Sequence, residues 1–291
     1  MLGLTLFDLT LLLVCVDMQR EIIPTGIASD LLQPLSRDRP DAVGRDADLD
    51  EGTTLRPPPE IIDPPEEYLP RLREICDRHN VLLVADEVLV GVGRTGTWWA
   101  MEPSGVAPDI MTFGKGISGG YAALSGIAAP DRIVDAIARG SGNFMHAQTF
   151  SHHPVACAAG VATMRYLKKH SLIERCARMG RVLHQRLATL AELPHVGDVR
   201  GRGLLAGIEF VEDKGSRAPF PRSVTFAETF ADAALDAGLT VWPNVGQADG
   251  TNGDLVMVAP PFIIEEEEID EIVSRCTTAL QKTVAGMKVR A

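Results

Sequence analysis

The chain has 291 residues, of which 45% are hydrophobic and 23% are charged, and its formal net charge is −11. This length allows one large domain or two smaller ones. The acidic balance argues against binding to nucleic acid, which needs clustered Lys and Arg, and no apolar run is long enough to span a membrane. The five cysteines are scattered and lack C-x-x-C spacing, which indicates reduced thiols in a cytoplasmic protein.

Residues 1–62 form an atypical N-terminal segment that ends in a linker. Residues 2–16 are mostly apolar, but no basic residue precedes them, so the pattern does not indicate a secretory signal. Residues 29–59 are charged, are interrupted by prolines and show neither helical nor strand periodicity.

Residues 63–291 alternate between helical and strand patterns. We expect Asp63 to cap a helix with one apolar face, followed by apolar strands at residues 81–85 and 109–113 and a further strand within 124–129. Helices are predicted at residues 154–169, 172–193, 224–237 and 265–280, and strands at 204–211, 239–242 and 255–259. This pattern predicts an α/β protein with a parallel sheet and a smaller α+β unit.

Two of the predicted strands end in residues that can do chemistry. Asp86 follows the first strand, and Lys115 lies in a glycine-flanked turn after the second. In open parallel sheets, ligands bind outside the carboxyl ends of the strands. A lysine there can form a Schiff base with the aldehyde of pyridoxal phosphate, and a carboxylate can pair with the protonated pyridine nitrogen.

Single motifs allow other interpretations. Residues 91–96 fit the G-x-G-x-x-G dinucleotide fingerprint, but no glycine-packed helix is expected after them. Residues 116–120 fit the G-x-S-x-G nucleophile elbow, which also needs a following helix. A metal site is a further interpretation of four residues: His146, His152, His153 and Cys157. They lack the paired spacing that metal ligands usually show. The plainest alternative is that Lys115 is a solvated loop lysine and Asp86 a carboxylate at the sheet edge.

Several segments in order resemble class III, pyridoxal-phosphate-dependent aminotransferases. They are residues 85–88 (ADEV), 91–96 (GVGRTG), 112–116 (TFGKG), 146–154 (HAQTFSHHP), 199–204 (VRGRGL) and 258–262 (VAPPF). The resemblance implies part of a fold-type I large domain at residues 63–155, with an incomplete parallel sheet, and a small α+β domain at residues 156–291. It implies transfer of an amino group between a small-molecule amine or amino acid and an oxo acid.

The resemblance also assigns roles to four residues. Lys115 would be the catalytic Schiff-base lysine, Asp86 would keep the pyridine nitrogen of pyridoxal 5'-phosphate protonated, and Val88 would pack against the ring. Thr149 would bind the cofactor phosphate of a neighbouring subunit, which implies a homodimer. Family members that act on α-amino acids such as ornithine place an arginine where this chain has Met257, so a carboxylate clamp is not expected there, although Arg202 or a mobile arginine could replace it.

Two features that the family places before the aspartate strand are not visible ahead of Asp63: a Ser/Gly-rich turn for the phosphate and an aromatic residue that stacks on the ring. The chain thus resembles the C-terminal part of such an enzyme, with activity impaired by truncation. A catalytically silent fragment, or a same-fold aminomutase or decarboxylase, is the alternative. Residues 11–20 resemble the first strand of isochorismatase-like hydrolases. An exposed sheet edge is expected unless residues 11–16 supply a replacement strand.

Overall fold

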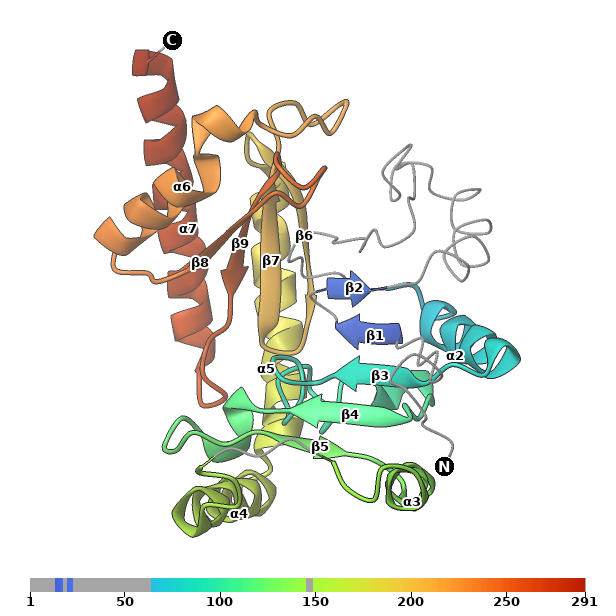
Figure 1. Ribbon diagram of the computed structural model, residues 1–291. Helices are drawn as coiled ribbons and strands as arrows, with labels where there is room; N and C mark the ends of the chain where they lie inside the picture. The colour runs from blue at the N-terminus through green and yellow to red at the C-terminus, as the bar shows by residue number, and fades with distance from the viewer. Residues whose placement is uncertain (1–13, 18–19, 23–63, 145–148, 291) are drawn as a thin grey trace.

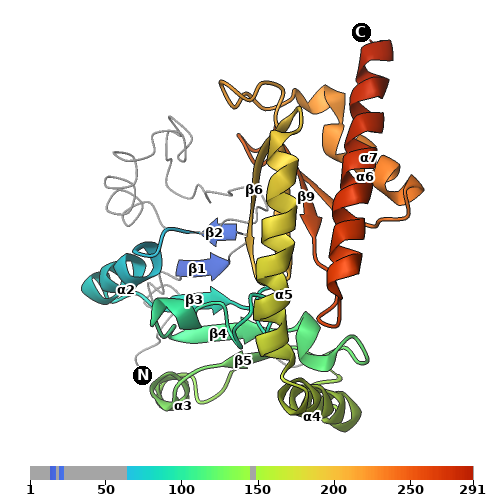
Figure 2. The ribbon, with the colours of Figure 1, turned by 180° about the vertical axis from the view of Figure 1, so that it is seen from behind.

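The computed structural model describes residues 14–17, 20–22, 64–144 and 149–290, which form two sheets flanked by helices (Figures 1 and 2). The first sheet has the strand order β2-β1-β3-β4-β5. Its strands are β1 (Val14–Asp17), β2 (Arg20–Ile22), β3 (Leu83–Asp86), β4 (Ile110–Phe113) and β5 (Gly126–Ala128). The α/β class is confirmed. However, only β1, β3 and β4 are parallel, because β2 and β5 pair antiparallel at the two edges.

The strand β1 occupies the edge of β3 that the sequence left open. It pairs with β3 in parallel, with Val14 opposite Leu83 and Asp17 opposite Asp86. The hairpin of β1 and β2 therefore supplies a replacement strand, and β1 overlaps the residues 11–16 expected for that place. The edge of the sheet becomes the three-residue strand β2, and such a short edge strand offers little backbone for pairing with other chains.

Helix α2 (Tyr68–His79) covers one face of this sheet. Its buried Leu72, Ile75 and Cys76 pack in one cluster with Leu83 and Ala85 of β3. The helix begins at Tyr68 after Glu67, which makes no capping hydrogen bond, so the expected cap at Asp63 is wrong by four residues and Asp63 itself lies outside the described residues. The predicted linker at residues 29–59 also lies outside them.

Buried Asp109 ties β3 and β4 to the helices. Its carboxylate accepts a hydrogen bond of 2.7 Å from the Leu83 N–H and one of 2.7 Å from Arg73 of α2. Arg132, in helix α3 (Asp131–Arg139), pairs with the same carboxylate. Burial alone would raise the pKa of Asp109, but these partners outweigh it and lower the pKa below its ordinary value.

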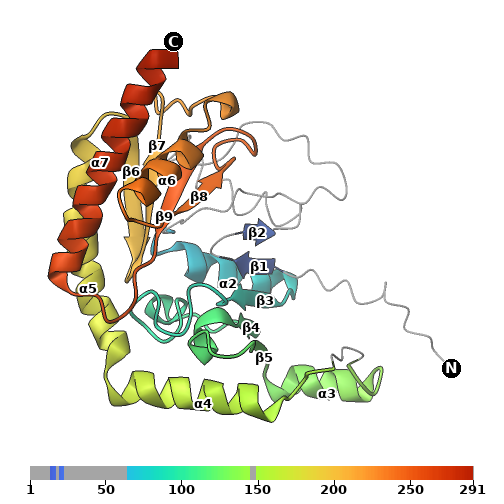
Figure 3. The ribbon, with the colours of Figure 1, turned by 90° about the vertical axis from the view of Figure 1, so that its left-hand side faces the viewer.

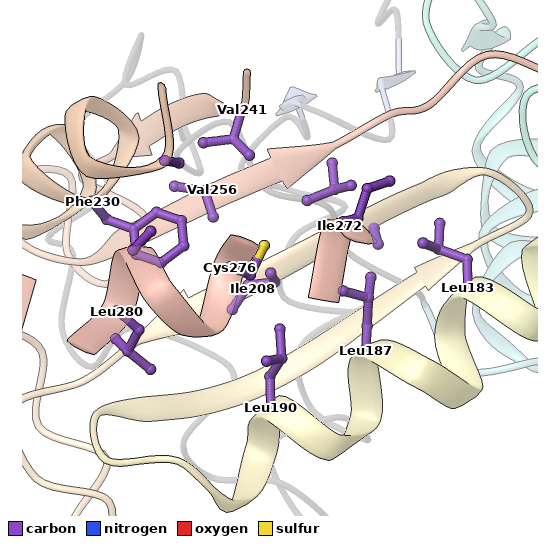
Figure 4. Close-up of a cluster of buried hydrophobic side chains, with 14 of the residues drawn as sticks. Leu183, Leu187, Leu190, Ile208, Phe230, Val241, Val256, Ile272, Cys276 and Leu280 are labelled. Carbon is purple, nitrogen blue, oxygen red and sulfur yellow. The ribbon is translucent and has the colours of Figure 1, made fainter. Parts of the chain in front are cut away.

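The second sheet has the strand order β6-β7-β9-β8 and is antiparallel throughout. Its strands are β6 (Val196–Arg202), β7 (Leu205–Phe210), β8 (Trp242–Val245) and β9 (Asp254–Val258). The helices of this half are α5 (Leu172–Leu187), α6 (Phe226–Asp236) and α7 (Glu266–Arg290). Figure 4 shows the core, in which Leu183, Leu187, Ile208, Phe230 and Cys276 gather between helices and strands.

Helix α4 (Pro154–Lys169) leads into α5 and lies with α3 along one side of the molecule (Figure 3). The predicted boundary between residues 155 and 156 falls in the first turn of α4 and stays a prediction. Cys76, Cys176 and Cys276 are buried free thiols, and Cys157 of α4 is an exposed one. No helix in the described part of the chain combines the length and the apolar character needed to cross a membrane.

Candidate active site

Asp86 and Lys115 lie at the same edge of the first sheet, as predicted. Strands β3 and β4 are parallel and neighbouring, and Asp86 is in register with Thr112. Just beyond, the Glu87 N–H donates a hydrogen bond of 2.9 Å to the Thr112 carbonyl oxygen. Since Lys115 follows Thr112 by three residues, the acid and the amine both come from the carboxyl ends of adjacent strands.

The chain turns sharply after Asp86, and this turn fixes the carboxylate. The Val88 N–H donates a hydrogen bond of 2.9 Å to Asp86 Oδ1, which is a local aspartate turn. The turn brings Val88 close to the start of the Lys115 turn, because a Cβ atom added at Gly114 would lie 3.4 Å from Val88 Cγ1. The structure thus brings three predicted site residues to one place in the backbone: Asp86, Val88 and Lys115.

Lys115 begins a short 3-10 turn, Lys115–Ser118, and has a positive φ of 42°. Positive φ is uncommon outside glycine, and strained positions of this kind concentrate at functional sites. The turn is held by a hydrogen bond of 3.0 Å from the Ile117 N–H to the Gly114 carbonyl. The Lys115 side chain is exposed, and it has no ion-pair partner among the described residues. Its amine is therefore accessible.

Ser118 does not act as the serine of a nucleophile elbow. Its side chain is buried and its hydroxyl donates to the Ala122 carbonyl oxygen at 2.5 Å. No α-helix follows it directly, because Gly119 has a positive φ of 61° and ends the turn. The dinucleotide interpretation of residues 91–96 fails in the same way, because those residues form turns and the next helical element is only the three-residue 3-10 turn Glu102–Ser104.

Sequence reasoning missed the role of Glu87, the residue next to Asp86. Its carboxylate is 1% exposed and accepts hydrogen bonds of 2.9 Å from the N–H groups of both Ala100 and Met101. Burial raises the pKa of Glu87 above its ordinary value, although these two hydrogen bonds oppose the shift. Glu87 therefore connects the strand end that carries Asp86 to the segment that follows residues 91–96, the glycine-rich loop. The only sequence signal was its position beside Asp86.

Sequence reasoning also missed Arg94, in the middle of the glycine-rich loop. Its guanidinium donates to the carbonyl oxygens of Leu204, at 2.9 Å, and Pro260, at 2.7 Å. It also lies 4.7 Å from the centroid of the Phe262 ring. Burial lowers the pKa of Arg94, but an arginine stays charged at neutral pH. The loop beside the site is thus anchored to the second half of the chain.

Thr149 is exposed and lies in the turn that precedes α4. Within the described part of the chain, no hydrogen bond joins Thr149 to Asp86, Val88 or Lys115. Helix α4 itself packs on the Lys115 turn, because a Cβ atom added at Gly160 would lie 3.6 Å from the Ile117 carbonyl oxygen. Of the residues considered for a metal, His146 lies outside the described residues. Within the described part of the chain, no three His, Cys, Asp or Glu side chains are grouped as metal ligands.

Met257 of β9 occupies the position where some relatives of the resembled family have an arginine. It packs beside an apolar cluster of Val90, Ala100 and Leu205, at the back of the glycine-rich loop. The Met257 side chain thus takes part in apolar packing and itself offers no charge for a carboxylate clamp. Arg202 lies on β6, where it is half-buried.

Comparisons with known proteins identify this arrangement. The sequence profile of the class-III aminotransferases matches residues 61–280. The chain is 40% identical over 228 residues to the uncharacterized aminotransferase YodT of Bacillus subtilis, covering 78% of this chain and 50% of that protein. It is 35% identical over 231 residues to a diaminobutyrate–2-oxoglutarate transaminase of Halomonas elongata, covering 78% of this chain and 48% of that protein.

Solved structures agree with the sequence matches. An amine transaminase from an uncultivated Pseudomonas species, solved in its pyridoxal-phosphate-bound form, is 37% identical with a TM-score of 0.70, covering 77% of this chain and 49% of that one. The chain spans about half the length of the curated relatives that it matches. The family match begins at residue 61, so it lends no support to the isochorismatase-like resemblance of residues 11–20, which stays a prediction.

Proposed function

Because the chain belongs to the class III aminotransferase family, we propose that it transfers an amino group between a small-molecule amine or amino acid and an oxo acid, with pyridoxal 5'-phosphate as cofactor. The observation that carries the proposal is the parallel pairing of β3 and β4, which puts Asp86 and the Lys115 turn at one sheet edge. Acid and amine at that edge are the two groups that this cofactor needs.

The residues fit the cofactor at two points. Oδ1 of Asp86 receives the Val88 N–H, while Oδ2 has no donor among the described residues and is open to a protonated ring nitrogen. The exposed amine of Lys115 has no competing ion pair in the described structure. When bound, pyridoxal phosphate would supply an electron sink for bond cleavage at the carbon that bears the substrate's amine.

Each of the three residues near the sheet edge has one task in this proposal. The Lys115 Nζ atom would hold the cofactor and, as a free amine, would accept and return a proton at the substrate carbon that bears the amine. The Asp86 carboxylate would keep the ring nitrogen protonated through its charge. Val88 would pack against the ring face and exclude water there.

A second copy of the chain is the proposed partner. Helix α4 carries large apolar side chains on its surface, among them Val155, which is 67% exposed, and Tyr166, which is 57% exposed. Phe150, in the turn before the helix, is 77% exposed and lies next to Thr149. An apolar surface of this kind favours contact with another protein, and a homodimer through it would bring Thr149 to the neighbour's cofactor phosphate. The free thiols support a cytoplasmic location.

Borohydride trapping tests the central assignment. The full chain is incubated with pyridoxal phosphate, reduced and mapped by peptide mass spectrometry, and we expect the label on Lys115. Lys115→Ala should remove the label, whereas Lys168→Ala, which changes an exposed lysine of α4, should leave it in place. Label on another lysine in the wild-type chain would refute the role of Lys115.

A catalytically silent fragment is the alternative function. The absorbance of purified protein mixed with pyridoxal phosphate separates the two functions. A band that changes when an amine is added supports amino-group transfer, and a spectrum equal to that of free cofactor supports the silent fragment.

A further inference from the structure

The glycine-rich loop contains a buried residue in a strained backbone conformation. Val92 has a positive φ of 55° and is 2% exposed. Among the described non-glycine residues with positive φ, Val92 alone is buried. A left-handed backbone is unfavourable for a β-branched residue, and such strain persists only where the surrounding structure holds it. The contacts of Val92 therefore show which part of the fold requires this conformation.

The Val92 side chain faces the Lys115 turn. A Cβ atom added at Gly116, the residue after Lys115, would lie 3.5 Å from Val92 Cβ and 3.8 Å from Val92 Cγ1. Apart from the chain neighbours of Gly116, no other described residue would come within 4 Å of that atom. Val92 also shares an apolar cluster with Ile117, the next residue of the turn. One side of the Lys115 turn thus rests on Val92.

Helix α5 holds the glycine-rich loop from its other side. A Cβ atom added at Gly93 would collide with Ile173 Cδ1, and one at Gly96 would lie 2.9 Å from Ala177 Cα. Ile173 is buried in the same cluster as Val92. Because the interior of a protein is close-packed, the loop has little room to move away from the turn. The loop therefore lies between α5 and the Lys115 turn.

We propose that Val92 is a positioning residue that acts through Lys115. Lys115 itself has a positive φ, so two strained residues meet at Gly116. Val92 supports the turn beside Lys115 and so restricts where the base of the exposed Lys115 side chain lies. Support of the turn needs no cofactor, whereas the consequence for cofactor attachment rests on the proposed function.

The plain alternative is that Val92 only fills the core. Val90→Ala is the matched control, because Val90 is 4% exposed and packs in a different cluster, with Ala100 and Leu205. Val92→Ala and Val90→Ala remove the same methyl groups from buried sites. If Val92 contributed only to core stability, the two variants would loosen the Lys115 turn equally for an equal loss in the free energy of unfolding, which urea unfolding measures.

Amide hydrogen exchange of the full chain without added cofactor tests the support directly. The reporter is the Ile117 N–H, which donates a hydrogen bond of 3.0 Å to the Gly114 carbonyl oxygen within the turn. We expect Val92→Ala to raise the exchange rate at Ile117 about tenfold or more relative to Val90→Ala. Adding Gly116→Ala to Val92→Ala should reverse much of this rise, because the new Cβ atom restores part of the contact with residue 92.

Three outcomes of the exchange experiment would overturn the proposal. They are an unchanged rate at Ile117 in Val92→Ala, an equal rise in Val90→Ala, and a double variant that exchanges as fast as Val92→Ala alone. If Val92→Ala does not fold, Gly116→Ala alone decides. Its added contact should slow exchange at Ile117, and an unchanged or faster rate refutes the support by Val92.

Borohydride trapping with pyridoxal phosphate then tests the consequence for Lys115. We expect Val92→Ala to slow the labelling of Lys115 about tenfold, because the amine is less well placed, and Val90→Ala to leave the rate near that of the wild type. Equal labelling rates in the two variants would refute the positioning role. A wild-type chain that takes up no label, but shows the exchange effect, supports the contact and counts against the proposed function, so the two failures are distinguishable.

Discussion

The Arg94 guanidinium reaches across the chain to the Pro260 carbonyl oxygen, 2.7 Å away, although 166 positions separate the two residues. The same guanidinium holds the Leu204 carbonyl, and the Leu204 N–H donates back to the Arg94 carbonyl at 3.1 Å. The Arg94 side chain thus joins the glycine-rich loop to the residue that precedes β7 and to the segment that follows β9.

Replacing this arginine should destabilise the fold. Arg94→Ala removes the donor to the carbonyl groups of two buried residues, Leu204 and Pro260, and we expect the free energy of unfolding to fall by about 2 to 4 kcal/mol. Arg94→Lys keeps the charge but lacks the planar fork, so it should restore only part of the loss. Urea unfolding measures both. An Ala variant as stable as the wild type would show that the contact contributes nothing.

Asp86→Asn should weaken catalysis far more than folding. An amide has almost the same shape as a carboxylate but no charge, so it cannot stabilise a protonated pyridine nitrogen. We expect a loss of about 3 kcal/mol or more of transition-state stabilisation. Half-reaction rates, measured in a chain that is otherwise active, check this, with the urea midpoint as the folding control. Near-normal rates would contradict the assigned role.

Glu87→Gln should change how stability depends on pH. Burial raises the folded-state pKa of Glu87, so its stabilising contribution is full below the unfolded pKa of about 4.5 and is lost as pH rises through the folded value. The Gln variant does not titrate. At low pH the Gln variant should be about 1 to 2 kcal/mol less stable than the wild type, because one of the two N–H groups that Glu87 holds loses its acceptor. The difference in the free energy of unfolding should narrow as pH rises. Parallel stability profiles for the two proteins would rule this out.

Gly203→Ala should be severely destabilising, and Gly105→Ala only mildly so. Both glycines have positive φ, at 54° and 68°. A Cβ atom at Gly203 would lie 2.4 Å from the Thr95 carbonyl carbon, whereas one at Gly105 would meet nothing within 4 Å. The backbone strain is common to both and costs about 1 kcal/mol, so the excess loss in Gly203→Ala measures the close approach to the loop. Equal unfolding free energies for the two variants would contradict the clash.

The sequence predicted the elements whose reasons are local. Helix α4 has its predicted bounds, and the strands carrying Asp86 and leading to Lys115 were visible as uninterrupted apolar runs. Strand β6 was not predicted, because its polar, glycine-containing sequence becomes a strand only by pairing with β7. Helix α3 was also missed, since its nine residues bury no side chain in the described structure.

Within the site, the sequence could place residues along strands but could not place contacts between distant segments. Asp86 and Lys115 follow from strand ends, which are local features. Two hydrogen bonds, from the Met101 N–H to Glu87 and from Arg94 to the Pro260 carbonyl, depend on tertiary packing. No sequence pattern near Glu87 or Arg94 predicts them. The alignment of Asp17 with Asp86 depends likewise on which strand fills the sheet edge.

The labelling rates of the buried cysteines report how often each sheet and its covering helix open. Burial raises the pKa of Cys276 to about 12, and only the thiolate reacts readily with thiol reagents. Cys276 can therefore be modified only when α7 separates from the second sheet, and buried Cys76 only when α2 separates from the first. Exposed Cys157 reacts without any opening of the fold, so its labelling rate serves as the reference. The labelling rates at the two buried thiols thus report whether the halves open together or one after the other.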